Sequence, residues 1–452
     1  MFRTICLTAY TIYEIEFKRL HSDTTTISFY GDYELDDTQI DFDILEIIRG
    51  FNKDHLPQCK QVVFGKIVNE HGIPLASSVM NGNTSDIEWN KKAIELAGEI
   101  FKNGLTKGVY IADSKLMTKE IFGTMMIPDK KIKFISRCPA NFSNKIAARV
   151  TQKAYSDDNW IELGRYGSGK RACEYSAIEY TEKVYGHDVR LVVVKSSAGL
   201  ERFETQKEKE LKAIQEDIKK VNKKQFACEA DAKKEWERFL KKYKKSVYSF
   251  DVTFKENITE KRPRGNPGKN PKPPKKISTW DINIKVSGEN KENMDKMLQA
   301  KESFVLITNT DKNEVLTSDV LGYYKNQIKV ELNFKLLKQP CIASVIYLKK
   351  PERIRALTML LGISLLVRAL IQYKIRKAIS EYEGELPKVG REGRTLHTNP
   401  TIKFLKDEMR NQYFERTGYN QYKIAFTSPF RKTQTMTFLK FLGFTLEDLL
   451  DT

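Results

Sequence analysis

Short apolar runs bounded by turn residues fill the first third of the chain, and they indicate strands. Residues 24–33 alternate apolar with small polar side chains, the period of two that is typical of a half-buried strand. Residues 59–83 hold two apolar runs on either side of a turn at 69–72, which predicts a hairpin. The apolar runs 108–116 and 132–138 predict two more strands.

Helical periodicity appears between and after these strands. Residues 84–104 predict a helix that begins at one of the capping residues 84–86. Residues 304–309 predict a strand, and 317–338 predict one helix that stops before a proline. A long apolar helix is expected over 351–381. Arg368 interrupts its most apolar part, and a membrane span needs about 20 apolar residues, so we interpret it as a buried core helix and expect no membrane partner.

The middle of the chain has a different pattern. Residues 160–195 predict short strands, and 200–245 predict a charged helical hairpin. The stretch 261–276 holds seven basic residues, five prolines and no acid, so we expect an extended basic linker. Phosphate contact by this linker is plausible, because basic proline-rich arms lie in DNA minor grooves.

Charge changes the picture more than composition does. The chain of 452 residues carries 77 Lys and Arg against 59 Asp and Glu, a formal net charge of +18. Its apolar content of 40% is enough for a real core and excludes wholesale disorder. A surplus of basic residues of this size favours a protein with a polyanionic partner, most often nucleic acid, over a soluble protein that is merely basic. The six cysteines lie far apart without a C-x-x-C pair, so reduced thiols in a cytosol fit best.

Three carboxylates are candidates for a common site. Asp23 lies at the edge of the first strand, and Asp113 ends the apolar strand "VYIAD". Glu331 shares one stripe of the predicted helix 317–338 with Tyr324, Gln327 and Lys338, because their spacings of 3, 4 and 7 residues follow the helical period. Alone, each carboxylate is also explained as a turn former or a surface residue. Together they are hard oxygen ligands without His or Cys, which suits magnesium and not zinc.

Four segments resemble the DDE transposases of bacterial insertion sequences, in the IS-four superfamily. They are "LHSDTTTISFYGDYE" around Asp23, "GIPLASSVMNGNTSD" after it, "GVYIADSKLMT" at Asp113, and "YYKNQIKVELNFKLLK". The last is similar to the family's Y-(2)-R-(3)-E-(6)-K signature, with Tyr324, Gln327, Glu331 and Lys338 at the four places. Spacing is kept and one residue departs, since Gln327 stands where the family has Arg. The four segments occur in the family's order between about residue 21 and about residue 380.

The resemblance implies an α/β fold with a ribonuclease H-like mixed sheet flanked by helices. An insertion domain would interrupt it between the second Asp strand and the Glu helix, since 331 − 113 leaves 218 residues. The expected domain ranges are a remnant of an amino-terminal region at 1–20, a first core part at 21–138, an insertion at 139–301 containing the basic linker, a second core part at 302–381, and a basic tail at 382–452 that is helical and contacts DNA or a second copy. Relatives place an end-binding region before the first Asp, so the resemblance also implies truncation of this chain.

The same resemblance implies roles for these residues. Asp23, Asp113 and Glu331 would bind two Mg²⁺ ions, with Mn²⁺ as a possible substitute, while Tyr324, Gln327 and Lys338 would contact DNA. Water would cut at the transposon end, and the freed 3′ hydroxyl would attack target DNA without ATP. The expected partners are double-stranded DNA, as transposon ends and target, and a second copy of the chain on DNA, in the cytoplasm and associated with the nucleoid.

Two alternatives stay open on the sequence. One is a ribonuclease H-like endonuclease that cuts DNA without strand transfer, and the other is a truncated, non-catalytic DNA-binding remnant. The intact acidic residues argue against loss of activity by point mutation, but they do not exclude loss by truncation.

Overall fold

The chain divides into two compact units, which are described separately. The computed structural model describes all residues except 32, 34–43, 103–107, 129–131, 168–171, 262–274, 339–347, 349, 387, 390–393, 397–398, 405–411, 419–420 and 450–452. Unit 1 comprises Met1–Ser143, Lys183–Arg190 and Ile307–Thr452, and unit 2 comprises Asn144–Glu182 and Leu191–Leu306.

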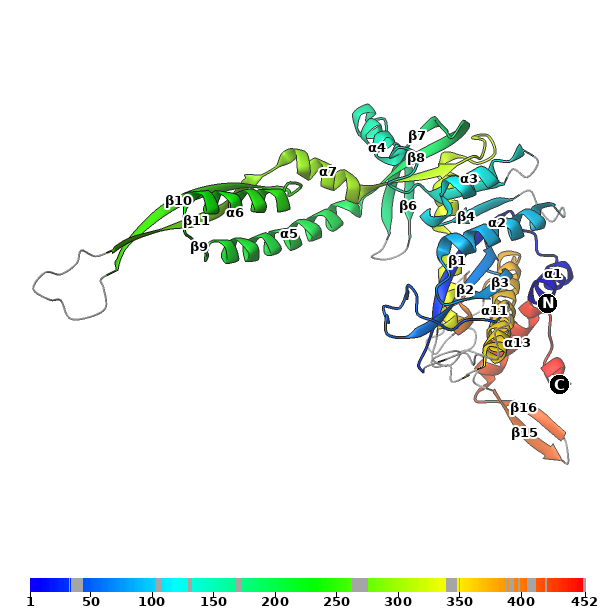
Figure 1. Cartoon of the computed structure of the whole chain (residues 1–452). Helices are drawn as coiled ribbons and strands as arrows, with labels where there is room; N and C mark the ends of the chain where they lie inside the picture. Colours follow the sequence, from blue (N-terminus) through cyan, green and yellow to red (C-terminus); the bar gives the residue numbers. More distant parts are fainter. Residues whose placement is uncertain are drawn as a thin grey trace, which may run out of the picture. The chain divides into compact units, whose positions relative to one another are not determined.

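Unit 1 is built on a mixed sheet flanked by helices (Figure 1), which confirms the α/β prediction. Its first elements are α1 (Phe2–Ile12), β1 (Arg19–Phe29), β2 (Lys60–Asn69), β3 (Pro74–Met80), α2 (Asp86–Lys102), β4 (Val109–Ala112), the 3₁₀ turn η2 (Ser114–Leu116), α3 (Lys119–Met125) and β5 (Lys133–Arg137). After unit 2 the chain continues with α8 (Thr317–Lys325), α9 (Ile328–Leu337) and α11 (Pro351–Ser380). Helix α1 lies in the stretch for which we expected only a remnant.

The strand order in unit 1 is β3-β2-β1-β4-β5. β1, β2 and β3 pair antiparallel, which confirms the predicted hairpin, whereas β4 runs parallel to both β1 and β5. Strands β8 (His187–Ser196) and β12 (Ser303–Thr308) are each divided between the two units. At the end of β12 that belongs to unit 1, Thr308 Oγ1 donates a hydrogen bond to the Phe134 carbonyl oxygen on β5 at 2.6 Å.

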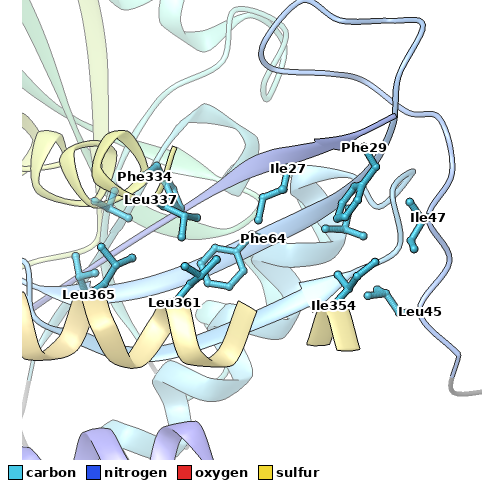
Figure 2. Close-up of a cluster of buried hydrophobic side chains, with 13 residues drawn as sticks. Ile27, Phe29, Leu45, Ile47, Phe64, Phe334, Leu337, Ile354, Leu361 and Leu365 are labelled. Carbon is cyan, nitrogen blue, oxygen red and sulfur yellow. The ribbon is translucent and has the colours of Figure 1, made fainter. Parts of the chain in front are cut away.

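One face of the sheet is covered by α9 and α11. Phe334 from α9 and Leu361 from α11 meet Phe64 of β2 in a buried cluster (Figure 2). Odd-numbered residues of β1, such as Ile27, and even-numbered residues of β2 point to this face, as the strand period requires. Burying each large side chain contributes about 1.5–3 kcal/mol. Asp23, also odd-numbered on β1, therefore emerges on the face that α9 covers.

The other face is covered by α2. Ser85 and Glu88 form a capping box at its start, each side chain accepting the other's backbone N–H, at 3.2 and 2.7 Å. Trp89 of α2 is 1% exposed and donates through Nε1 to Ser22 Oγ of β1 at 2.9 Å. Its ring lies so close to β2 that a Cβ on Gly65 would come within 2.4 Å of it, which explains the glycine in mid-strand.

The carboxy-terminal part of unit 1 packs on α11. Its elements are β13 (Lys388–Val389), β14 (Arg394–Thr395), β15 (Gln412–Gly418), β16 (Gln421–Phe426), α13 (Pro429–Leu442) and η5 (Glu447–Leu449). The expected helical tail is helical only in part, since two β hairpins precede α13 among the described residues. Phe438 of α13 and Ile375 of α11 share a buried cluster. Among the described residues, α11 is the helix long and apolar enough to cross a membrane, and its most apolar stretch is 33% buried.

Unit 2 combines strands with a charged helical pair. Its elements are α4 (Ile146–Asp157), β6 (Ile161–Tyr166), β7 (Cys173–Val184), the later part of β8, α5 (Gly199–Val221), β9 (Gln225–Phe226), α6 (Glu229–Lys242), β10 (Tyr248–Lys261), β11 (Lys275–Glu289), α7 (Lys291–Glu302) and the start of β12. The predicted helical hairpin is confirmed by α5 and α6. The linker interpretation of 261–276 is wrong at its ends, because Lys261 and Lys275 pair in the hairpin β10–β11. Residues 262–274 lie outside the described residues.

Lys66 is a fully buried amine in unit 1. It lies on β2 opposite Asp23 in the strand register and is 0% exposed. Its Nζ has no hydrogen-bond partner among the described residues. Burial lowers the pKa of Lys66 to about 7, although the nearby Cys6 thiol acts to raise it. Keeping this amine inside costs free energy whenever it is charged.

Lys66→Met should therefore stabilise the protein at and below neutral pH. Lysine has a pKa of about 10.4 when unfolded, so the unfolded wild type binds more protons than the folded one between pH ~7 and pH ~10. Its free energy of unfolding should rise with pH across that window. The variant lacks this contribution, and its advantage should be a few kcal/mol near pH ~6 and vanish near pH ~10. Urea unfolding of both proteins at the two pH values checks this; a variant less stable than wild type near pH ~6 would contradict it.

Candidate active site

Asp23 and Asp113 lie at matching positions of neighbouring parallel strands. The pairing of β1 with β4 includes His21↔Ile111, and two residues further along the same register Asp23 comes beside Asp113. Neighbouring strands are about 4.8 Å apart, so the two residues emerge close together at the end of β4. The negative charge of Asp113 raises the pKa of Asp23, as expected for neighbouring carboxylates.

Local hydrogen bonds hold Asp113 in place. It is the N-cap of η2, and its Oδ1 accepts the Lys115 N–H at 3.0 Å. The Ser136 hydroxyl on β5 donates to the Asp113 carbonyl oxygen at 2.7 Å. An Asp that follows a buried parallel strand thus has its backbone tied to the next strand and its side chain oriented by its own turn.

Asp86 and Lys53 also belong to this site, and neither was predicted from the sequence. Asp86, the first residue of α2, accepts a hydrogen bond from the Thr24 hydroxyl and acts electrostatically on both Asp23 and Asp113. The Lys53 ammonium lies 3.0 Å from Asp86 Oδ1 and 3.7 Å from Asp23 Oδ1. It also donates to the Thr24 carbonyl oxygen at 3.0 Å. A cation of the chain itself therefore lies among the carboxylates.

Asn52 fixes the segment that carries Lys53. Its side-chain amide donates to Ser28 Oγ and to Gln61 Oε1, both at 2.9 Å, while its Oδ1 accepts the N–H groups of Asp54 and Leu56. The next residue after Lys53 makes a second ion pair. Lys338 Nζ donates to both carboxylate oxygens of Asp54, each at 2.6 Å.

Burial dominates the titration of the two strand-borne carboxylates. It raises the pKa of Asp23 to about 6, while the Lys53 ammonium and the Thr24 N–H act to lower it and Asp113 and Asp86 to raise it. Burial also raises the pKa of Asp113, against the Lys115 N–H that lowers it. The Asp23 side chain keeps 24% of its surface exposed, so it remains reachable from solvent. A half-buried carboxylate in this range can hold a cation or accept a proton near neutral pH.

Tyr324 connects Glu331 with the two aspartates. Burial raises the pKa of its hydroxyl, Arg137 acts to lower it, and Asp113, Glu331 and Asp23 all raise it further. All three carboxylates therefore act electrostatically on one phenol. Glu331 is exposed in the first turn of α9. The structure thus brings Asp23 and Asp113 side by side, while Glu331 is exposed to solvent on α9.

The predicted single helix over 317–338 is wrong, because the chain breaks between α8 and α9. At the break, the Gln327 N–H bonds the Tyr324 carbonyl oxygen at 3.0 Å, three residues back instead of four. The Gln327 side chain is 9% exposed and donates to the Ser22 carbonyl oxygen at 2.8 Å, and its Oε1 lies 3.4 Å from His21 Nδ1. Lys338 is the C-cap of α9. Tyr324 and Glu331 therefore lie on different helices, and Gln327 points into unit 1.

The donor set suits a hard divalent cation in kind but is incomplete in arrangement. Asp23, Asp113 and Asp86 offer only oxygen atoms, as Mg²⁺ prefers. In the part of the chain that the structure describes, no three side chains of His, Cys, Asp or Glu form a group that could hold a metal ion. Lys53 lies within ion-pair distance of Asp23 and Asp86, so it would have to move before a cation could take its place.

The interior position of Gln327 gives a direct test of its role. Gln327→Arg should destabilise the protein by about 3–5 kcal/mol, because a guanidinium would be buried without a carboxylate, and DNA affinity should not increase. Ile328→Arg, one residue on and 51% exposed, is the matched control and should leave stability nearly unchanged. Urea unfolding and gel retardation measure the two effects. A stable Gln327→Arg variant with tighter DNA binding would instead support the predicted DNA contact.

The comparisons with known proteins show a distant structural likeness. No family model and no curated protein sequence matches the chain. Among solved structures, the chain is similar to the piggyBac transposase in the cryo-EM structure of its synaptic complex with hairpin DNA, at 8% sequence identity and a TM-score of 0.35. The alignment covers 94% of this chain and 54% of that one, so the chain spans about half the length of its neighbour. We therefore base the proposed function on the residues of this chain alone.

Proposed function

We propose that the chain is a DNA transposase of the DDE type, with Asp23 and Asp113 at its catalytic centre. The observation that carries the proposal is the register of β1 with β4, which brings two carboxylates together beside Tyr324. The sequence resemblance selected these same residues independently of any geometry. A mixed sheet flanked by helices also agrees with the ribonuclease H-like core that the resemblance implies.

In this proposal the acidic residues hold the divalent cations. Asp23 and Asp113 would provide the central ligands, with Glu331 as the third member of the set and Asp86 as an additional neighbour. Bound Mg²⁺ or Mn²⁺ would activate a water or a sugar hydroxyl and stabilise the leaving oxygen of a phosphodiester. The proposed reaction cuts the strand at the transposon end, and the freed 3′ hydroxyl then attacks target DNA in a transesterification that conserves the number of phosphodiester bonds.

Basic and phenolic side chains would hold the DNA. Tyr324, whose pKa is raised by the same carboxylates, would orient a phosphate oxygen beside them. Lys338 would exchange its contact with Asp54 for a backbone phosphate, which a lysine binds as a point charge. The net charge of +18 supplies the long-range attraction. A homodimer would hold two transposon ends, as the resemblance implies.

A second candidate function is DNA binding without catalysis. The observation that favours it is the ion pairing of Lys53 with Asp23 and Asp86, since an ammonium among the carboxylates competes with a divalent cation for the same oxygens. The two functions differ in one measurable respect, because only the first requires metal-dependent strand cleavage.

A nicking assay on supercoiled plasmid in Mg²⁺ or Mn²⁺ tests the proposal. Asp23→Asn, Asp113→Asn and Glu331→Gln should each reduce nicking on the order of 100-fold or more, because each removes charge where the reaction needs it. Glu95→Gln removes an exposed carboxylate from the same helix as Asp86 and should nick like the wild type. An assay with DNA that carries transposon ends then distinguishes strand transfer into target DNA from cutting alone.

Two results would go against the transposase. Wild-type protein that retards DNA but never nicks it would support the non-catalytic alternative. Metal-dependent nicking that the Asp and Glu substitutions abolish, without strand transfer from transposon ends, would support the endonuclease.

A further inference from the structure

A second charged cluster lies at the start of β1, four residues before Asp23. We define the basic cluster as Arg19 at the start of β1, Lys329 in the first turn of α9 and Arg376 in α11. All three belong to unit 1 and are half-buried. They surround the turn between β2 and β3, where His71 is exposed to solvent. None of them belongs to the set of residues proposed for catalysis.

Packing fixes each member of the basic cluster. The Arg19 guanidinium lies 4.2 Å from the centre of the Tyr323 ring. Arg376 donates through Nε to the Pro400 carbonyl oxygen at 3.1 Å, and three residues before it the Tyr373 ring lies against His71, with centroids 4.9 Å apart.

Lys329 is held against the same turn. A Cβ placed on Gly72 would lie 3.8 Å from the Lys329 Cβ. Asn333, one turn further along α9, donates to the carbonyl oxygens of Gly72 and Lys329, both at 3.0 Å. The cluster therefore exists before any ligand arrives.

Positive charge in this cluster is not balanced. Among the described residues, the acid that acts on this turn together with the three cations is Glu70. Its carboxylate already accepts the backbone N–H groups of Lys18 and Arg19 and lies 3.6 Å from an Arg19 nitrogen. No hydrogen bond or ion pair of Lys329 Nζ occurs among the described residues. Burial and then the neighbouring Arg376 lower the pKa of Lys329, the direction expected for cations that repel one another in a half-buried place.

We propose that the basic cluster binds a backbone phosphate of the nucleic-acid strand that enters the carboxylate site. An Arg fork and a Lys point charge are the pair of donors that phosphate recognition uses, and an anion there would relieve the uncompensated charge. Arg19, His21 and Asp23 alternate along one face of β1, so the cluster lies about 13 Å from Asp23 at ~3.3 Å per residue. A few nucleotides of one strand span that distance. The choice of nucleic acid as the source of the phosphate rests on the proposed function.

The first test uses inorganic pyrophosphate and thermal unfolding of the full chain. Without phosphate, Lys329→Met should unfold at a higher temperature than wild type, because it removes a repelled charge and keeps the aliphatic stem. Pyrophosphate, compared with NaCl at equal ionic strength, should raise the unfolding temperature of wild type and of Lys329→Arg but not of Lys329→Met. Lys335→Met, exposed on the same helix, should respond like wild type. Equal stabilisation of all four proteins would overturn the site.

The second test asks whether the phosphate belongs to DNA. The slope of log affinity for duplex DNA against log salt should fall by about 0.9 in Lys329→Met, the loss expected for one phosphate contact, and stay unchanged in Lys335→Met. Pyrophosphate binding with an unchanged DNA slope would assign the cluster to a small phosphate compound and overturn the nucleic-acid partner. Neither measurement depends on strand cleavage. A protein that never nicks but shows both effects would keep this inference while losing the transposase proposal.

Discussion

The enclosure of β1 is the constraint on which the rest of unit 1 depends. β1 pairs with β2 on one edge and β4 on the other, and α2 and α9 pack on its faces. Polar groups on such a strand must find partners inside the protein. Ser22 accepts from Trp89 through its hydroxyl and from Gln327 through its carbonyl oxygen. Asp23 is partly exposed in the middle of this enclosed strand, between the buried residues Ser22 and Thr24, so its raised pKa follows from the same confinement.

Much of unit 1 could be predicted from local sequence, because local physics decides it. The hairpin of β2 and β3 follows from two apolar runs around a turn, and the start of α2 follows from a Ser and a Glu three residues apart. Asp113 follows the end of β4 as predicted, whereas Asp23, expected at the start of a strand over 24–33, lies inside β1; their proximity follows from the register of β1 with β4. These features depend on contacts within one hairpin or on one strand register.

The parts that sequence reasoning missed depend on contacts between distant residues. The break before α9 accompanies the hydrogen bond from Gln327 to Ser22, residues 305 apart in sequence, which helical periodicity cannot register. Lys53 belongs to no helical or strand pattern in the sequence. Its position depends on Asn52, whose hydrogen-bond partners lie on β1 and β2. Asp86 looked like one of three capping residues, while Ser85 does the capping and Asp86 faces Thr24 and Lys53. The basic segment looked like a linker because the pairing of the strands beside it, β10 and β11, was not recognised.

The anchoring of residues 52–54 couples two charges of opposite sign. Lys53 meets Asp23 and Asp86, Asp54 meets Lys338, and the Asn52 side chain bonds the backbone on which both are carried. The backbone of residues 52–54 therefore sets the positions of a base and an acid together. A substitution at Asn52 would disturb the pairing of Lys53 with the carboxylates and that of Asp54 with Lys338 at the same time.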